Sequence, residues 1–302
     1  MANQTPLQYR VIHSTLYEYT DPVLISQHLA HLKPRDTANQ RCLSFDLQST
    51  PSPSVFHHHS DYFGNGSTHL AFEGAHRNLV VRATSQVEVE PISQPKPSAT
   101  PSWETVRSRS EGSQWSEDTL AGEYTFGSTY VTARPEFRDY SLNSFARDRP
   151  ILDAALDLTA RIHTDFKFDT TATNVSTPVL EVFKRRRGVC QDFAHFQIAC
   201  FRSLGLPARY VSGYLETLPP AGKKKLVGAD ASHAWVSFWC PGTGWIDVDP
   251  TNNCCPSEHH VSLGWGRDYQ DIAPLRGILV GGARHKLSVS VDLARLDPFS
   301  TS

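Results

Sequence analysis

The sequence predicts an α+β protein in which an antiparallel β-sandwich precedes a core of helices and strands. Residues 7–95 contain several strand-like runs separated by turn signals, which is typical of a sandwich. In 79–90, apolar and polar residues alternate, as in a strand with one face in water. Beyond residue 146 the pattern changes: 151–166 has apolar residues at helical spacing, and strand-like runs begin at 208. Helices followed by strands indicate the α+β class.

We expect three segments along the chain. An N-terminal β-sandwich domain covers residues 1–95, a linker and irregular segment covers 96–145, and a core with a C-terminal strand covers 146–302. The stretch 91–101 contains four prolines and few large apolar residues, which is typical of a linker. The alternating run 287–293 predicts a terminal strand that could pair with either sheet.

The last three strands of the core are expected at 208–216, 233–240 and 245–248, with 219–228 as a mobile connection between the first two.

Composition and charge exclude some functions. With 39% hydrophobic residues the chain can bury a real core, and a formal net charge of −2 gives no sign of nucleic acid or an anionic membrane as partner. No apolar run approaches the ~20 residues that a bilayer span needs. Residues 1–20 lack the basic and apolar regions of a signal peptide, so we expect a cytoplasmic protein.

The six cysteines do not form a metal or disulfide pattern. None belongs to a C-x-x-C pair, and Cys254 and Cys255 are adjacent, which suits neither a zinc site nor an ordinary disulfide. In a reducing compartment the question is therefore which single thiol is reactive.

Cys190 stands at the start of a predicted amphipathic helix. Apolar residues follow it at a period near 3.6, and Gly205 and Pro207 end the helix. A cysteine in the first helical turn feels the positive end of the helix dipole, which favours thiolate over thiol. We therefore take Cys190 as a candidate nucleophile. The alternative is a small buried cysteine that begins an ordinary core helix.

A thiol nucleophile needs an imidazole to take its proton, and the imidazole needs an acceptor on its other nitrogen. His233 stands at the start of one predicted strand and Asp249 at the end of the next. If the two strands form a hairpin, both residues lie at the same end of it. A helix N-terminus packed against that end would bring Cys190 within reach.

Three runs resemble the core motifs of the transglutaminase-like superfamily, in that family's order. They are Gly188-Val189-Cys190-Gln191-Asp192, His233-Ala234-Trp235 and Trp245-Ile246-Asp247-Val248-Asp249-Pro250-Thr251. The resemblance implies a papain-like transglutaminase core, with a cysteine-bearing helix packed on an antiparallel sheet. It also implies Cys190 as nucleophile, His233 as base and later acid, and Asp249 rather than Asp247 as the residue that orients the histidine.

The resemblance extends beyond the core. Tyr9-Arg10-Val11-Ile12-His13-Ser14-Thr15-Leu16-Tyr17 and Asp61-Tyr62-Phe63-Gly64-Asn65 resemble the N-terminal β-domain of bacterial transglutaminase-like proteins, and 266–275 resembles their C-terminal segment. The implied chemistry is acyl transfer from a peptide or protein amide through a thioester. Hydrolysis is the leading expectation, a protein–glutamine amine transferase is the alternative, and a non-catalytic binding module is the second.

Other residues receive smaller roles. Gln191 and Trp235 are candidates for binding the substrate: Gln191 could contact its amide, and Trp235 would wall the cleft or fill the core. His57-His58-His59 and His259-His260 are interpreted as solvated rather than metal-binding, because consecutive histidines on a strand point to opposite faces. We expect no metal and no cofactor. His195 lies five residues after Cys190 and off the face of the thiol, so we expect a hydrogen-bonded supporting residue rather than a catalytic one. Asp192 is expected to stabilise the first turn of the helix.

Overall fold

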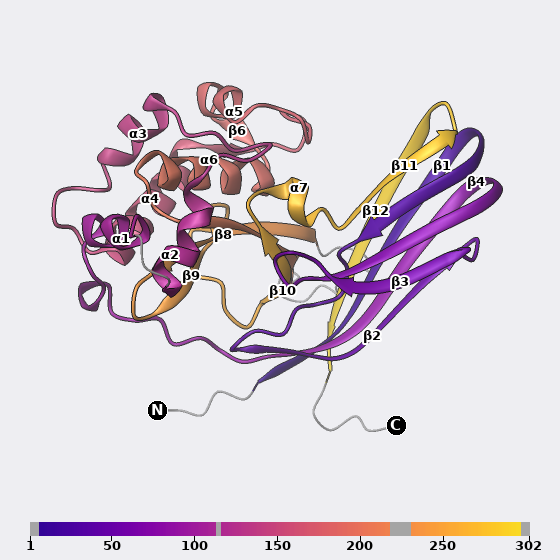
Figure 1. Cartoon of the computed structure of the whole chain (residues 1–302), viewed down its shortest axis with the longest axis horizontal. Coiled ribbons are helices and arrows are strands. Elements are labelled where there is room, and N and C mark those ends of the chain that lie inside the picture. Colours follow the sequence, from indigo (N-terminus) through magenta and orange to yellow (C-terminus); the bar gives the residue numbers. More distant parts are fainter. Residues whose placement is uncertain (1–5, 113–115, 218–230, 297–302) are drawn as a thin grey trace, which may run out of the picture.

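A computed structural model describes residues 6–112, 116–217 and 231–296. The connection predicted at 219–228 lies outside the described residues. A group of helices and a small sheet occupy one end of the molecule, and long strands occupy the other (Figure 1). None of the described helices is both long enough and apolar enough to cross a membrane.

The long strands form one antiparallel sheet around two central members, β1 (Leu7–Ala30) and β4 (Gly66–Val89). On one side of this pair, β12 (His285–Arg295) joins the first half of β1 and β11 (Leu275–Gly281) joins the second half. On the other side, β2 (Gln40–Thr50) pairs with the second half of β4, and β3 (Val55–Ser60) pairs with its first half.

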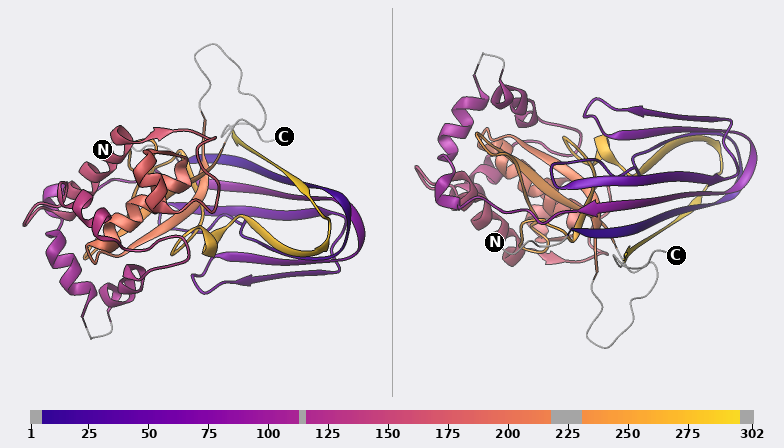
Figure 2. Two further views of the ribbon diagram at one scale, coloured as in Figure 1. Left: turned by 90° about the horizontal axis from the view of Figure 1, so that it is seen from above. Right: turned by 90° about the horizontal axis from the view of Figure 1, so that it is seen from below.

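This single sheet folds over on itself to make a sandwich. The pairing of β1 with β4 is interrupted between Glu18 and Val23, and the long strands turn back at the end farthest from the helices (Figure 2). Gly281 and Gly282 supply positive φ angles of 98° and 78° at the corner between β11 and β12. Buried side chains from both layers, including Leu70 and Leu79, fill the space between them.

The helical part begins after the sandwich. Its helices are α1 (Trp103–Ser110), α2 (Glu117–Ala121), α3 (Pro135–Leu142), α4 (Ile151–Asp165), α5 (Val179–Arg185), α6 (Cys190–Ser203) and α7 (Tyr269–Ile272), with 3₁₀ turns η1 (Pro97–Ala99) and η2 (Gly122–Thr125). A short parallel pair, β5 (Lys167–Phe168) and β6 (Arg187–Gly188), precedes α6.

The core sheet has the strand order β10-β7-β8-β9 and is antiparallel throughout. Its members are β7 (Ala208–Leu215), β8 (Ala231–Cys240), β9 (Gly244–Val248) and β10 (His260–Gly266). Helix α6 packs on this sheet, and Phe201 stacks on Phe238 of β8 with ring centroids 5.2 Å apart. The fold is α+β, with an N-terminal antiparallel sheet and a helix-on-sheet core, as the sequence predicts.

Chain segments distant in sequence join the sandwich to the core. β11 and β12 belong to the segment 146–302, which is expected from the sequence to form the core, yet they pair with β1 of the N-terminal sheet. A small apolar cluster between the two parts includes Tyr9, Tyr214 and Val261. Beside it, the buried carboxylate of Glu216 accepts hydrogen bonds from Arg295, Tyr9 and His259.

Candidate active site

Cys190 is the first residue of α6, and the chain around it is held by Asp192. The Asp192 carboxylate accepts hydrogen bonds from the backbone N–H of Val189 at 2.8 Å and from the hydroxyl of Thr173 at 2.6 Å. A side chain at position 188 would collide with this carboxylate, so the glycine there allows the close approach. Asp192 thus stabilises the first turn, and the half-buried Cys190 thiol stands at the positive end of the helix dipole.

His233 and Asp249 meet at one end of the hairpin formed by β8 and β9. Val236 pairs with Val248, which brings the start of β8 beside the residue that follows β9. Nε2 of His233 donates to Oδ2 of Asp249 at 2.7 Å. The His233 side chain is also hydrogen-bonded to Cys190. The structure therefore joins the three predicted residues in the order thiol, imidazole, carboxylate.

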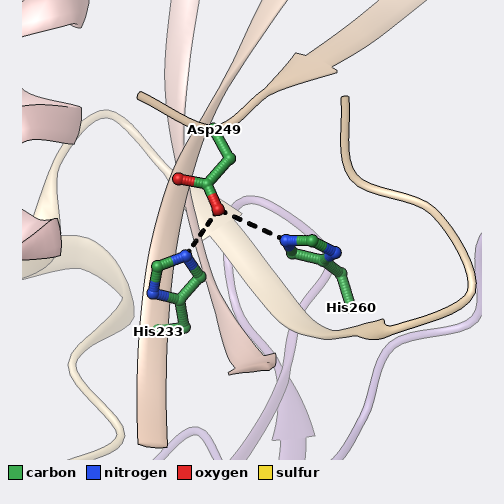
Figure 3. Close-up of side chains that lie close together, drawn as sticks. All are labelled: His233, Asp249 and His260. Atoms are coloured by element: carbon green, nitrogen blue, oxygen red, sulfur yellow. Dashed lines mark hydrogen bonds and ion pairs between the residues drawn. The ribbon is translucent and has the colours of Figure 1, made fainter. Parts of the chain in front are cut away.

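Asp249 is fully buried, and its carboxylate accepts hydrogen bonds from several donors. Oδ1 accepts the backbone N–H groups of Thr251 and Asn252, and Oδ2 accepts the Asn252 side-chain amide at 2.7 Å. Oδ2 also accepts a hydrogen bond from Nε2 of His260 at 3.3 Å, so two imidazoles bond to the same oxygen (Figure 3). Five hydrogen bonds thus hold the carboxylate in one position.

Among the described residues, one group of three side chains could hold a metal ion, and it consists of His233, Asp249 and His260. The Nε2 atoms of His233 and His260 both lie at hydrogen-bonding distance from Oδ2 of Asp249. N–H···O bonds account for this arrangement, and both nitrogens would have to lose their protons to bind an ion. The geometry therefore fits a hydrogen-bond network.

The charges in this network stabilise one another. Burial alone would lower the pKa of His233, but its hydrogen bonds to Asp249 and Cys190 outweigh burial and raise the pKa to about 10. Burial would likewise raise the pKa of Asp249, and the bonds from His233 and His260 hold it well below its ordinary value. An imidazolium paired with a carboxylate is the charge arrangement that supports a neighbouring thiolate.

The remaining cysteines are in environments that suppress ionisation. Burial raises the pKa of Cys200 to about 12 and that of Cys254 to about 12, and it also raises the pKa values of Cys42, Cys240 and Cys255. Cys190 is therefore the one cysteine that combines a helix N-terminus with a histidine partner.

A cavity of about 410 Å³ opens beside Cys190 and His233, between the core and the sandwich. Gln191 lies on its wall, where a contact with substrate stays a prediction, and its amide makes a long 3.4 Å bond to the carbonyl of Val175. Tyr210 is also on the wall. Burial raises the pKa of its hydroxyl well above the ordinary value, with a further contribution from Cys190, so the hydroxyl keeps its proton at neutral pH.

Trp235 does not line the cavity, so its candidacy for binding the substrate is wrong, whereas the alternative that it fills the core is confirmed. It is completely buried, and its indole N–H donates to Asp247 at 2.9 Å. Its ring packs edge-on against His260 and fills the space left open by Gly213. Trp235 therefore packs behind the site and holds the ring of His260 in place. His195 is also buried, accepts the backbone N–H of Tyr269 and stacks on Tyr130.

Sequence reasoning missed two side chains of the site. His260 was dismissed with its neighbour as solvated, although only 8% of it is exposed and it contacts Asp249. Asn252 received no role, yet it donates both its backbone and its side-chain N–H to the same carboxylate. The position of Asn252 three residues after Asp249 was the available signal, because an amide there can cap the turn. His260 comes from another strand and offered no local signal.

Comparisons with known proteins show the family of the chain. Residues 9–88 match the bacterial transglutaminase-like N-terminal region, and residues 139–250 match the transglutaminase-like superfamily. The uncharacterized protein Rv2569c of Mycobacterium tuberculosis is 39% identical over 298 residues, which cover 95% of this chain and 92% of that one. The chain belongs to the transglutaminase-like superfamily.

Two further proteins are similar to this chain over a short stretch or at low sequence identity. A protein-glutamine gamma-glutamyltransferase of Pseudomonas aeruginosa is 42% identical over 83 residues, which are 27% of this chain and 12% of that protein. A crystal structure from Cytophaga hutchinsonii, described as "a Putative Cysteine Protease", aligns with a TM-score of 0.74 at 21% identity, covering 99% of this chain and 93% of that one. At that identity the likeness establishes the shared fold.

Proposed function

We propose that the protein is a thiol-dependent acyl-transfer enzyme that cleaves a carboxamide, peptide or isopeptide bond through Cys190, His233 and Asp249. The observation that carries the proposal is the His233 imidazole. It bonds Asp249 at 2.7 Å through Nε2 and is hydrogen-bonded to the Cys190 side chain at the start of α6. These are the contacts that a nucleophile, a general base and its orienting acceptor require.

The reaction follows from these contacts. The Cys190 thiolate attacks the carbonyl carbon, and the backbone N–H of Cys190, in the first turn of α6, donates to the developing oxyanion. His233 then gives its proton to the leaving amine as the C–N bond breaks, which leaves a thioester on the sulfur. A water molecule then loses a proton to His233 and attacks the thioester. The C–S bond breaks, the acid is released, and the Cys190 thiolate and the protonated His233 are restored.

Hydrolysis is the activity that we place first, with a peptide or protein amide as substrate. Amine transfer is the second candidate, because part of the chain is 42% identical to the protein-glutamine gamma-glutamyltransferase of P. aeruginosa. In that case a primary amine replaces water as the group that attacks the thioester. Both activities use the same three residues and differ only in the acceptor.

One experiment tests the proposal and separates the two activities. The protein is incubated with glutamine-containing and isopeptide-linked peptides, with and without a fluorescent primary amine, and ammonia, cleavage and incorporation are measured. Hydrolysis gives products without incorporation, and amine transfer gives incorporation. We expect Cys190→Ala to lose all turnover and Cys42→Ala, in the distant strand β2, to keep it. Full turnover by Cys190→Ala would reject the proposal.

A further inference from the structure

One wall of the cavity beside Cys190 comes from the sandwich. Strands β1 and β12 are paired there, with Thr15 opposite Val289 and Tyr17 opposite Leu287. Side chains alternate between the faces of a strand, so these four and Val291 lie on one face. That face looks across the cavity toward the cysteine, and we call Tyr17, Leu287 and Val289 the apolar wall.

The two β12 members of the apolar wall are exposed, and Tyr17 is half-buried against the core of the sandwich. Leu287 is 51% and Val289 is 50% exposed, whereas Val291, two residues further along, is only 2% exposed because it packs in the cluster between sandwich and core. The row from Leu287 to Val291 spans roughly 13 Å along β12. An aliphatic row of this length beside a nucleophile offers a surface that a ligand can cover.

Apart from the Cys190–His233 pair, the described lining of the cavity carries no charged side chain. Among the described residues that line it, none is Asp, Glu, Lys or Arg. His13 is buried between Thr15 and the Tyr214 hydroxyl, and burial lowers its pKa to about 4, so it is neutral at physiological pH. An ionised group placed against the apolar wall would lose its hydration without gaining a partner.

We propose that the apolar wall is the subsite for an uncharged aliphatic or aromatic group next to the scissile carboxamide, so that the sandwich sets the substrate class. This rests on the proposed function, since it takes Cys190 as the reacting atom. The core supplies the nucleophile and the acid–base pair, and β1 and β12 supply the preference. The substrates are then neutral amides or peptides with an apolar side chain beside the reacting carbonyl.

Two alkylating probes test the subsite without knowledge of the natural substrate. Iodoacetamide and N-hexyl-iodoacetamide deliver the same reactive carbon to Cys190, but only the second carries an apolar tail. The rate ratio of the two probes at Cys190 is measured by site-resolved mass spectrometry and divided by the ratio for glutathione. We expect a normalised ratio of roughly 10 in favour of the hexyl probe, the discrimination typical of an apolar pocket.

Substitutions on adjacent residues of β12 provide a matched pair. Val289→Asp puts a charge on the apolar wall and should bring the normalised ratio to about 1, and Leu287→Asn should lower it in the same direction. Ser290→Asp adds the same charge on the opposite face, where Ser290 is exposed, and should leave the ratio unchanged. Thermal melting checks that each variant is folded.

The outcomes separate this inference from the proposed function. An equal ratio in the native protein, Val289→Asp and Leu287→Asn would overturn the subsite, whatever the reactivity of Cys190. A fall in Val289→Asp with an unchanged ratio in Ser290→Asp supports it. If Cys190 reacts with both probes no faster than glutathione, the proposed function fails, and the normalised ratio still reports on the wall.

Discussion

Replacing His260 by phenylalanine removes one N–H donor from Asp249 and keeps an aromatic ring beside Trp235. His260 donates to Oδ2 at 3.3 Å, whereas His233 donates to the same oxygen at 2.7 Å. His260 does not touch the cavity, so it acts through Asp249 by fixing the direction in which the carboxylate faces His233. The expected effect is a loss of rate without a loss of substrate binding.

The geometry sets the size of this effect. A hydrogen bond to a charged group contributes about 1.5–3 kcal/mol, but a contact of 3.3 Å lies just beyond the usual range, so we take about 1 kcal/mol. Because 1.36 kcal/mol corresponds to a tenfold change in rate, His260→Phe should lower kcat about fivefold. Four of the five hydrogen bonds to Asp249 remain, which is why the loss is modest.

The assay compares two variants. His260→Gln keeps an N–H donor at about the same distance from the backbone, so it should restore kcat to within about twofold while KM stays constant in both variants. The alkylation rate of Cys190 between pH 5 and pH 9 gives a second reading that needs no substrate. Equal rates for His260→Phe and His260→Gln, or a change confined to KM, would refute a positioning role.

Three further substitutions test contacts that hold the fold: a carboxylate between the sandwich and the core, a close approach within the core sheet, and the start of α6. Burial raises the pKa of Glu216, but hydrogen bonds from Arg295, His259 and Tyr9 outweigh burial and lower it to about 2. This carboxylate therefore stabilises the fold above its unfolded pKa of about 4.3, and the stabilisation disappears as the pH falls through 2. In urea denaturation we expect Glu216→Gln to cost about 2 kcal/mol at pH 7, and the cost to shrink between pH 4 and pH 2. A cost that does not vary with pH would contradict the charge pairing. Gly213→Ala should lose about 1–3 kcal/mol, because its Cβ would collide with the Val261 carbonyl and the Trp235 ring; an unchanged melting temperature would show that this packing is loose. Asp192→Ala should cost about 1 kcal/mol and slow Cys190 alkylation, because the N–H of Val189 loses its acceptor; native stability and native reactivity would argue against its role at the helix start.

The parts of the site that the sequence predicts are those with local signals. Cys190 begins a helix with clear periodicity, and His233 and Asp249 stand sixteen residues apart at the ends of one hairpin. Short-range rules made these residues candidates, because the turn fixes which strand ends meet, and the resemblance to the transglutaminase-like superfamily implied their roles. Pairing of the hairpin then places the imidazole beside the carboxylate.

The parts that could not be predicted depend on pairing between distant strands. His260 reaches Asp249 only because β10 pairs with β7, which lies on the far side of β8 from β9. The terminal strand was expected, but its partner was left open, and its pairing with β1 is what makes Leu287 and Val289 part of the cavity. Trp235 was misplaced for a different reason: it lies two residues after His233 and shares its face, where the sheet is buried.

The central claim is that His233 activates Cys190, and the most direct measurement is site-resolved alkylation of all six cysteines by iodoacetamide at pH 6.5. We predict that Cys190 is labelled first in the native protein and that His233→Gln slows its labelling at least tenfold, with the other five thiols unchanged. The raised pKa of His233 and the suppressed ionisation of those five thiols are the physical reasons. Labelling of Cys190 at the same rate with and without His233, or earlier labelling of another cysteine, would contradict the account.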